Sequence, residues 1–214
     1  MALDIQAFKG VRDLVIAKMT VSNDESGKIV ETYGEVQPLA GVQNIGFDVN
    51  ESSATHYFDN IGALVIASEG EDTLTLTVSR TDLKTRALIE GRTYIESKTS
   101  EEKKKALIAT EQNKPYFAIG FKAKLTNGTE EWYWFYKGKF TAGSKEFATQ
   151  DDGTDINTMQ YTFAAVYTGA EFEIDGKTQP VKYALIEVAD ETKEPATSFF
   201  SAVTTPDKIA TLIA

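Results

Sequence analysis

Apolar and polar residues alternate over short stretches along most of the chain. The stretch DTLTLTVS, residues 72–79, shows this best: Leu74, Leu76 and Val78 fall on one side and the threonines on the other. Successive side chains of a β-strand point to opposite faces, so this period of two predicts a strand with one buried face. Similar strand-like segments cover residues 11–19, 34–49, 64–67 and much of the chain after residue 115.

Helical spacing is confined to short segments. In residues 79–91, SRTDLKTRALIEG, the start offers an N-cap with an acid in the first turn, and Gly91 is suited to end a helix. This predicts a helix at about residues 81–90. Thr205 followed by Pro206 predicts a second, terminal helix. The lysine-rich residues 101–109 favour a solvated loop over a helical turn or two.

No repeat of fixed period and no low-complexity linker divides the chain. We therefore expect residues 1–214 to form one mainly β domain, a β-sandwich or barrel with one or two short flanking helices. Residues 1–10 are a candidate N-terminal arm. The segment from about 171 to 214 is a C-terminal extension whose role the sequence leaves open.

Two dipeptides predict tight hairpin turns. Asn127–Gly128 and Asp175–Gly176 both tolerate the positive φ angles that a two-residue type I′ turn requires. The first joins PYFAIGF, residues 115–121, to the aromatic strand EEWYWFYKGKF, residues 130–140, which holds both tryptophans of the chain.

A two-residue turn would set the register of this hairpin. Phe121 then lies opposite Trp134, and Trp132, Trp134 and Tyr136 form a core face. The other face is neither plainly core nor plainly solvent, so it would lie under a helix of the same domain or against another subunit. We name it the candidate subunit-contact face, formed by Lys122, Tyr133, Phe135 and Lys137.

Composition excludes several kinds of chemistry. The chain has no cysteine, which rules out disulfides, thiolate ligands and thiol catalysis, and its single histidine, His56, rules out metal sites built on a histidine pair. No nucleophile-elbow, Walker or dinucleotide-binding motif is present. We expect no enzyme and no cofactor. The residues Asp151–Asp155 group three carboxylates in what is either an acidic turn or a cation site.

The charge is strongly and unevenly acidic. The net charge is −10, with eleven acids and four bases after residue 150 but nine bases and six acids in residues 101–150. Such a protein as a whole repels nucleic acid and anionic membranes. Copies of the protein could also stack with their oppositely charged parts facing each other. No apolar run approaches the ~20 residues of a membrane span, and the N-terminus lacks a signal-peptide pattern, so we expect no membrane partner.

The order of features resembles the major tail proteins of long, non-contractile-tailed bacteriophages. It runs from GVRDLVIAKM through LTLTVSRTDLKTRALIEG to PYFAIGF, WYWFYKGKF and MQYTF, covering roughly residues 8–170. The resemblance implies a β-sandwich subunit that assembles with itself into stacked, six-membered rings. It also implies a virion protein made in the host cytoplasm, with tape measure, tail terminator and distal tail proteins as partners, and DNA passing through the channel without specific binding.

Members of this family use extensions to reach the next ring. By location, two segments match such extensions: residues 50–60 and the polar loop within residues 20–34. The candidate inter-ring loop comprises Asn23, Asp24, Glu25 and Lys28. The alternative function is a carbohydrate-binding β-sandwich module, in which Tyr133 and Phe135 would lie on an open face and stack on sugar rings.

Overall fold

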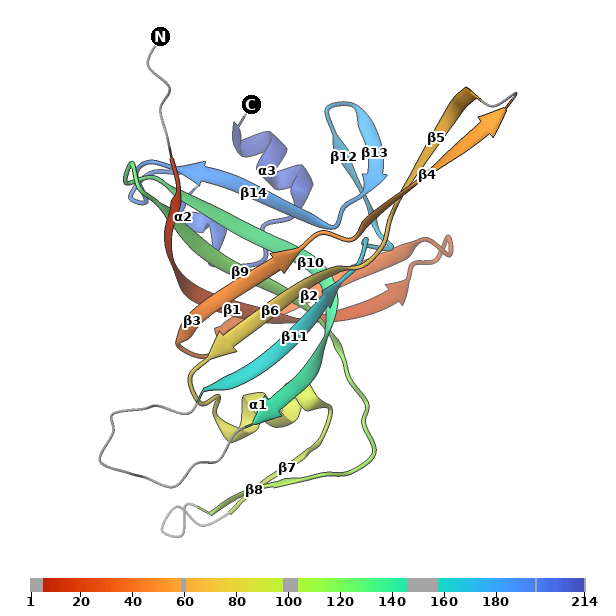
Figure 1. Cartoon of the computed structure of the whole chain (residues 1–214). Helices are drawn as coiled ribbons and strands as arrows, with labels where there is room; N and C mark the ends of the chain where they lie inside the picture. The colour runs from red at the N-terminus through yellow and green to blue at the C-terminus, as the bar shows by residue number, and fades with distance from the viewer. Residues whose placement is uncertain (1–5, 59–60, 98–103, 146–157, 195, 214) are drawn as a thin grey trace.

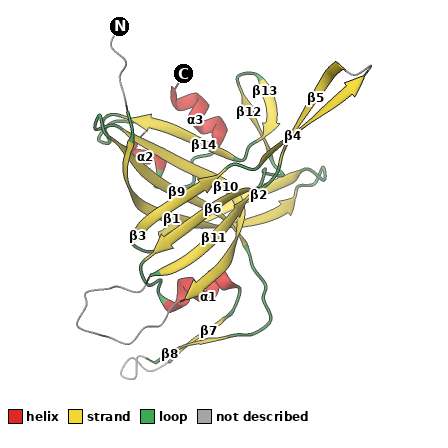
Figure 2. Ribbon diagram, in the orientation of Figure 1, coloured by secondary structure: helices red, strands yellow, loops and turns green. Residues whose placement is uncertain are grey.

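A computed structural model describes residues 6–58, 61–97, 104–145, 158–194 and 196–213. The protein is mainly β, built on one large antiparallel sheet with a few short helices (Figures 1 and 2). In chain order the elements are β1 (Phe8–Asn23), β2 (Ile29–Pro38), β3 (Val42–Asp48), β4 (Glu51–Phe58), β5 (Ile61–Glu69), β6 (Asp72–Val78), α1 (Leu83–Glu90), β7 (Thr93–Glu96), β8 (Lys105–Ile108), β9 (Tyr116–Leu125), β10 (Glu130–Lys145), β11 (Met159–Ala165), β12 (Glu171–Ile174), β13 (Lys177–Pro180), β14 (Tyr183–Val188), α2 (Ala196–Phe199) and α3 (Pro206–Ile213).

The large sheet has the strand order β2-β1-β9-β10-β11-β6-β3, and β14 adds to β10. The 16-residue strand β10 connects the two halves, because its first part pairs with β14 and its last part with β11. Figure 1 shows the result as two layers, with β3, β6 and β11 in front of β1, β9 and β14. The predicted mainly β, sandwich-like fold is confirmed.

An apolar core fills the space between these layers. Leu74 and Leu76 of β6 are fully buried there, as the alternating sequence predicts, and they pack with Phe117 and Ile119 of β9. The edges of the layers also meet, since β1 of one layer contacts β3 of the other. Burial of this apolar surface is the main stabilising contribution to the sandwich.

A second core lies on the outer face of the sheet, under the C-terminal segment. Trp134 Nε1 donates a hydrogen bond of 3.0 Å to the Phe199 carbonyl, and the Tyr136 hydroxyl donates one of 2.9 Å to the Thr204 carbonyl. Buried tryptophan and tyrosine require such polar partners, which the segment around α2 and α3 supplies. The segment after residue 171 is therefore part of the fold, with β14 in the sheet and α2 and α3 covering its outer face.

Helix α1 ends at Gly91 as the sequence predicts, but it starts at Leu83, after Asp82, the acid that was expected in its first turn. Asp82 is the N-cap, and its side chain accepts hydrogen bonds from the Lys84 and Thr85 amides. Gly91 ends the helix with φ 63°, a left-handed conformation that glycine adopts without a steric cost. Ile89 of α1 is buried in the inner core, so the helix packs against the sandwich.

The predicted register of the β9–β10 hairpin is wrong by one residue. Tyr133, not Trp134, lies opposite Phe121, because the turn contains three residues, Thr126 to Gly128. Only Gly128 has a positive φ there, as in a three-residue loop with a bulge, whereas a type I′ turn needs two. A one-residue shift moves the whole of β9 to the other face relative to β10.

Three further elements differ from or refine the sequence prediction. Residues 105–108, predicted as a loop, form β8, which pairs with β7 in a separate two-stranded ribbon. The Asp175–Gly176 turn is confirmed with positive φ at both residues, but it joins β12 to the short strand β13. The terminal helix is confirmed as α3, starting at Pro206.

Candidate functional site

The four residues of the candidate subunit-contact face do not share a face. Phe135 is fully buried in the inner core, where Tyr133 packs partly buried against it and stacks on Phe121 at 4.9 Å between ring centroids. Lys122 lies opposite Trp132 on the outer side, with its Nζ 4.2 Å from that ring. This corrects the prediction: the register shift places β9 side chains of the core opposite Tyr133 and Phe135.

Lys122 and Lys137 are instead engaged in ion pairs on the outer side of the sheet. Lys122 Nζ lies 3.0 Å from Asp13, and Lys137 Nζ lies 2.7 Å from the buried carboxylate of Glu31. Both side chains are mostly covered. They therefore hold strands of the subunit together and do not offer a free cationic surface.

The same burial removes the basis for a sugar-binding face. Stacking on a sugar ring requires an exposed aromatic face, but Phe135, Trp132 and Trp134 are at most 2% exposed. Tyr133 is partly covered and its hydroxyl donates to the Glu131 carboxylate. The aromatic strand thus belongs to two cores, one on each side of the sheet.

The candidate inter-ring loop is the exposed tip of the β1–β2 hairpin. Asp24 organises this tip, because its Oδ1 accepts hydrogen bonds from the Ser26 amide and hydroxyl and from the Lys28 amide, at 2.7–2.9 Å. The Ser26 hydroxyl bond, followed by the Lys28 amide bond, lowers the pKa of Asp24. Asn23, Glu25 and Lys28 are exposed around it, so all four predicted residues lie on one ordered turn.

The most unusual element is the β4–β5 hairpin. Among the described residues, its two strands pair with each other over Glu51–Phe58 and Ile61–Glu69 and with no other strand. It projects away from the sandwich at the upper right of Figure 1. A two-stranded ribbon on its own is at best marginally stable in water. Residues 50–60, matched by location to a family extension, fall on this hairpin.

A buried lysine fixes the base of this hairpin. Lys182 is 5% exposed, and its Nζ lies 3.0 Å from Asp72, which is 1% exposed. The same ammonium donates to the Gly70 carbonyl at 3.1 Å and lies 3.7 Å from Glu69 at the end of β5. Asp72 also accepts a hydrogen bond of 3.2 Å from the Asn50 amide, so one ion pair holds both ends of the hairpin.

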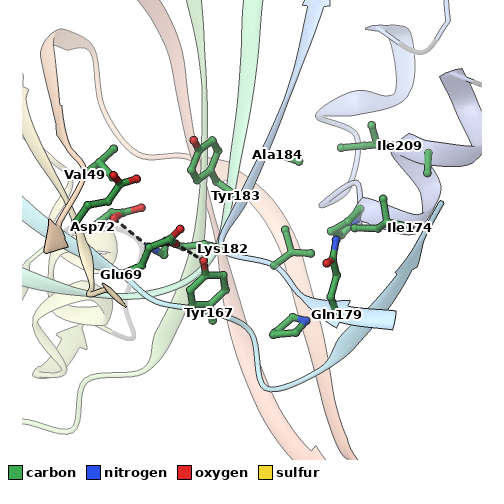
Figure 3. Close-up of a pocket in the computed structure, with 15 residues that line it drawn as sticks. Val49, Glu69, Asp72, Tyr167, Ile174, Gln179, Lys182, Tyr183, Ala184 and Ile209 are labelled. Atoms are coloured by element: carbon green, nitrogen blue, oxygen red, sulfur yellow. Dashed lines mark hydrogen bonds and ion pairs between the residues drawn. The ribbon is translucent and has the colours of Figure 1, made fainter. Parts of the chain in front are cut away.

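Tyr167 completes this cluster, which we call the Lys182 cluster: Asp72, Glu69, Tyr167 and Lys182 (Figure 3). Its ring lies 4.8 Å from the ammonium nitrogen, and its hydroxyl donates to the Glu69 carboxylate. That bond and burial raise the pKa of Tyr167 to about 12. The ring face and the carboxylates both attract the lysine ammonium group.

An open groove runs past the Lys182 cluster, between the hairpin base and α3. It has a volume of about 560 Å³ and lies in the size range of ligand-binding clefts. Its walls are largely apolar, and its acidic groups are Glu51, Glu69 and Asp72 (Figure 3). We call this the hairpin groove; its apolar walls include Val49, Ile174, Val181 and Ile209.

Among the described residues, no group of three or more histidine, cysteine or acidic side chains is arranged to hold a metal ion. His56 is in β4, opposite Leu64, and residues 151–155 lie outside the described part of the chain. None of the helices described is long and apolar enough to cross a membrane.

Neither the Lys182 cluster nor the hairpin groove was predicted from the sequence. Asp72 and Lys182 are 110 positions apart in the sequence. Each lies at the start of an ordinary strand-like segment. Only the meeting of the two layers brings them together. The one local signal is a lysine at the start of the apolar strand KYALIEV, where burial is not expected.

Relatives provide no further guide to this site, and its role is inferred from its own residues. No family model matches the chain, and no curated protein matches it.

Proposed function

We propose that this protein is the subunit of a phage tail tube, assembling with copies of itself into stacked, six-membered rings. A tape measure protein would occupy the channel during assembly, and tail terminator and distal tail proteins would cap the two ends. The proposal is supported by the resemblance over residues 8–170 and by the sandwich with short flanking helices.

The observation that carries the proposal is the β4–β5 hairpin. It extends from the body without packing on another strand, yet the buried Lys182–Asp72 pair fixes its base. An anchored ribbon whose strands pair with no other strand in the described part of the chain is suited to contact a neighbouring subunit. A sugar-binding module or an enzyme would have no need of such an arm.

The charge agrees with a conduit for DNA. Affinity for DNA comes mainly from basic side chains that neutralise phosphates, and this chain has ten more acids than bases. An acidic tube would let DNA slide without sticking. We place the protein accordingly in the virion tail.

The hairpin can be removed cleanly for a test. The Gly70 amide donates a hydrogen bond of 2.8 Å to the Asn50 carbonyl, so a short glycine-serine link can join these residues in place of 51–69. We expect the full chain to form rings or tubes at high concentration in electron micrographs. The shortened chain should fold but remain monomeric.

Antibody labelling provides the decisive result, because a tube subunit can stay monomeric until an initiator is present. Gold particles distributed along virion tails would support the proposal. Labelling elsewhere in the virion, or none, would contradict it. Thermal unfolding of the shortened chain serves as the folding control.

A further inference from the structure

The β7–β8 ribbon exposes an apolar face at the end of the molecule opposite the hairpin groove. Ile95 is 50% and Ile108 is 47% exposed, and the strand register places both on the same side of the ribbon. The other side carries Tyr94 and Leu107, which are partly buried and lie on the side of α1. The exposed isoleucine face therefore has no partner among the described residues.

The segment that contains this ribbon is basic. Residues 92–108 hold five basic and three acidic residues. Two of the bases, Lys104 and Lys105, come directly before the apolar residues of β8. Lys105 pairs with Glu96 of β7 at 3.4 Å, so the positive excess of this segment, beside the apolar face, comes from its other bases.

The hairpin groove has the complementary character. Its walls are largely apolar, and Glu51 and Glu69 are the acids open to a partner, because Asp72 is buried in its pair with Lys182. Val49 on one wall is 49% exposed, so apolar surface is open to a partner. Exposed apolar patches with a charged surround are typical of protein contact sites.

We propose that the β7–β8 ribbon of one subunit docks into the hairpin groove of a second copy. The proposal rests on the tail-tube function and specifies which surfaces join successive subunits. Ile95 and Ile108 enter between the apolar walls, and the basic ribbon faces the acidic groups of the groove. Complementary charge of this kind speeds association and fixes the orientation of the contact.

The positions of the two surfaces make the contact run head to tail. In Figure 1 the ribbon is at the bottom of the molecule, whereas β4, β12 and α3, which border the groove, are at the top. A subunit cannot fill its own groove with its own ribbon. A contact between two different patches repeats from copy to copy and generates a ring or a filament, and this end-to-end placement generates a stack.

Cysteine cross-linking tests this contact directly, since the chain has no cysteine of its own. We would mix one variant carrying Ile95→Cys with another carrying Val49→Cys under assembly conditions and add a short bismaleimide. The expected product is a covalent dimer that contains one of each variant. The matched control uses Phe8→Cys in place of Ile95→Cys. Phe8 is also exposed, at 64%, but it lies outside both the β7–β8 ribbon and the hairpin groove.

The result separates this inference from the proposed function. Tubes that form without a mixed dimer above the Phe8→Cys control would overturn the docking contact and leave the tail-tube function standing. Failure of virion labelling would instead contradict the function itself. A double variant, Ile95→Asp with Ile108→Asp, should form shorter tubes, while the thermal unfolding temperature of the subunit stays unchanged. Tubes of ordinary length would overturn the contact.

Discussion

At the scale of single residues, two lysine–carboxylate pairs differ sharply in their surroundings. Lys182 and Asp72 are 5% and 1% exposed, whereas Lys105 and Glu96, 3.4 Å apart, are about half exposed. Removing one member of a buried pair leaves an uncompensated charge in a poorly solvated site. Removing one member of an exposed pair returns the other to water.

Lys182→Met should therefore destabilise the protein strongly. We expect a loss of about 3 kcal/mol in the free energy of unfolding, measured by urea denaturation, because among the described residues the Asp72 carboxylate then keeps only the hydrogen bond from the Asn50 amide.

The control for that measurement is Lys105→Met, which should leave the free energy of unfolding nearly unchanged, because solvent screens this exposed pair. The double variant Lys182→Met with Asp72→Leu should recover much of the lost stability, because no buried charge remains. Equal effects of the two lysine substitutions would show that the burial of Lys182 does not contribute to the free energy of unfolding.

At the scale of elements, two glycines with positive φ end a helix and a hairpin turn. A Cβ atom at Gly91, φ 63°, would come within 2.5 Å of the Asn113 backbone carbonyl. A Cβ atom at Gly128, φ 94°, would meet nothing within 4 Å. Both positions impose the left-handed strain on an L-residue, but only the first adds a collision with backbone.

Gly91→Ala should accordingly cost much more stability than Gly128→Ala. The strain alone amounts to about 1–2 kcal/mol for an L-residue, which is what we expect for Gly128→Ala. Gly91→Ala should exceed it by at least about 1 kcal/mol, since the neighbouring loop must move. Chemical denaturation of both variants measures the difference, and equal losses would contradict the close approach to Asn113.

Elements with strong local signals could be predicted from the sequence. The α1 helix, with its cap at Asp82 and its end at Gly91, depends on contacts within a few residues, and so does the Asp175–Gly176 turn. The β9–β10 register was not predictable in the same way. Asn127–Gly128 fits both a two-residue and a three-residue turn, and the packing of Phe121 with Tyr133 is compatible only with the second.

At the scale of the whole molecule, the sandwich and the β4–β5 hairpin should differ in stability. The inner strands of the sandwich, such as β9 and β10, are joined on both sides and bury two apolar cores, whereas in the described chain the hairpin strands pair only with each other. Local opening requires little free energy where few buried contacts must break.

Hydrogen exchange should reveal this contrast. In the monomer we expect amides of β4 and β5 to exchange far faster than those of β9 and β10, and assembly into tubes should slow the exchange of the hairpin. Amides of β12 and β13, a two-stranded ribbon within the body, provide the comparison. Hairpin exchange that is unchanged in tubes would argue against its role as a contact between subunits.

The candidate sites could be located from sequence only where they are local. The β1–β2 tip depends on Asp24 and nearby amides, and its four residues do lie together. The hairpin groove depends on the meeting of segments near residues 50, 70 and 182. Such distant segments meet only through the topology of the sheet, which periodicity and turn residues leave open.

The burial of both tryptophans under one layer has an optical consequence. Trp132 and Trp134 lie on the outer face of the sheet, and rings of Phe199 and Phe200 cover them at centroid distances of 5.3–6.5 Å. No tryptophan lies in the inner core or on the projecting hairpin. The intrinsic fluorescence of this protein is therefore a selective probe: its emission wavelength reports whether the C-terminal helical layer is seated, and it is silent about the arms that would join one subunit to the next.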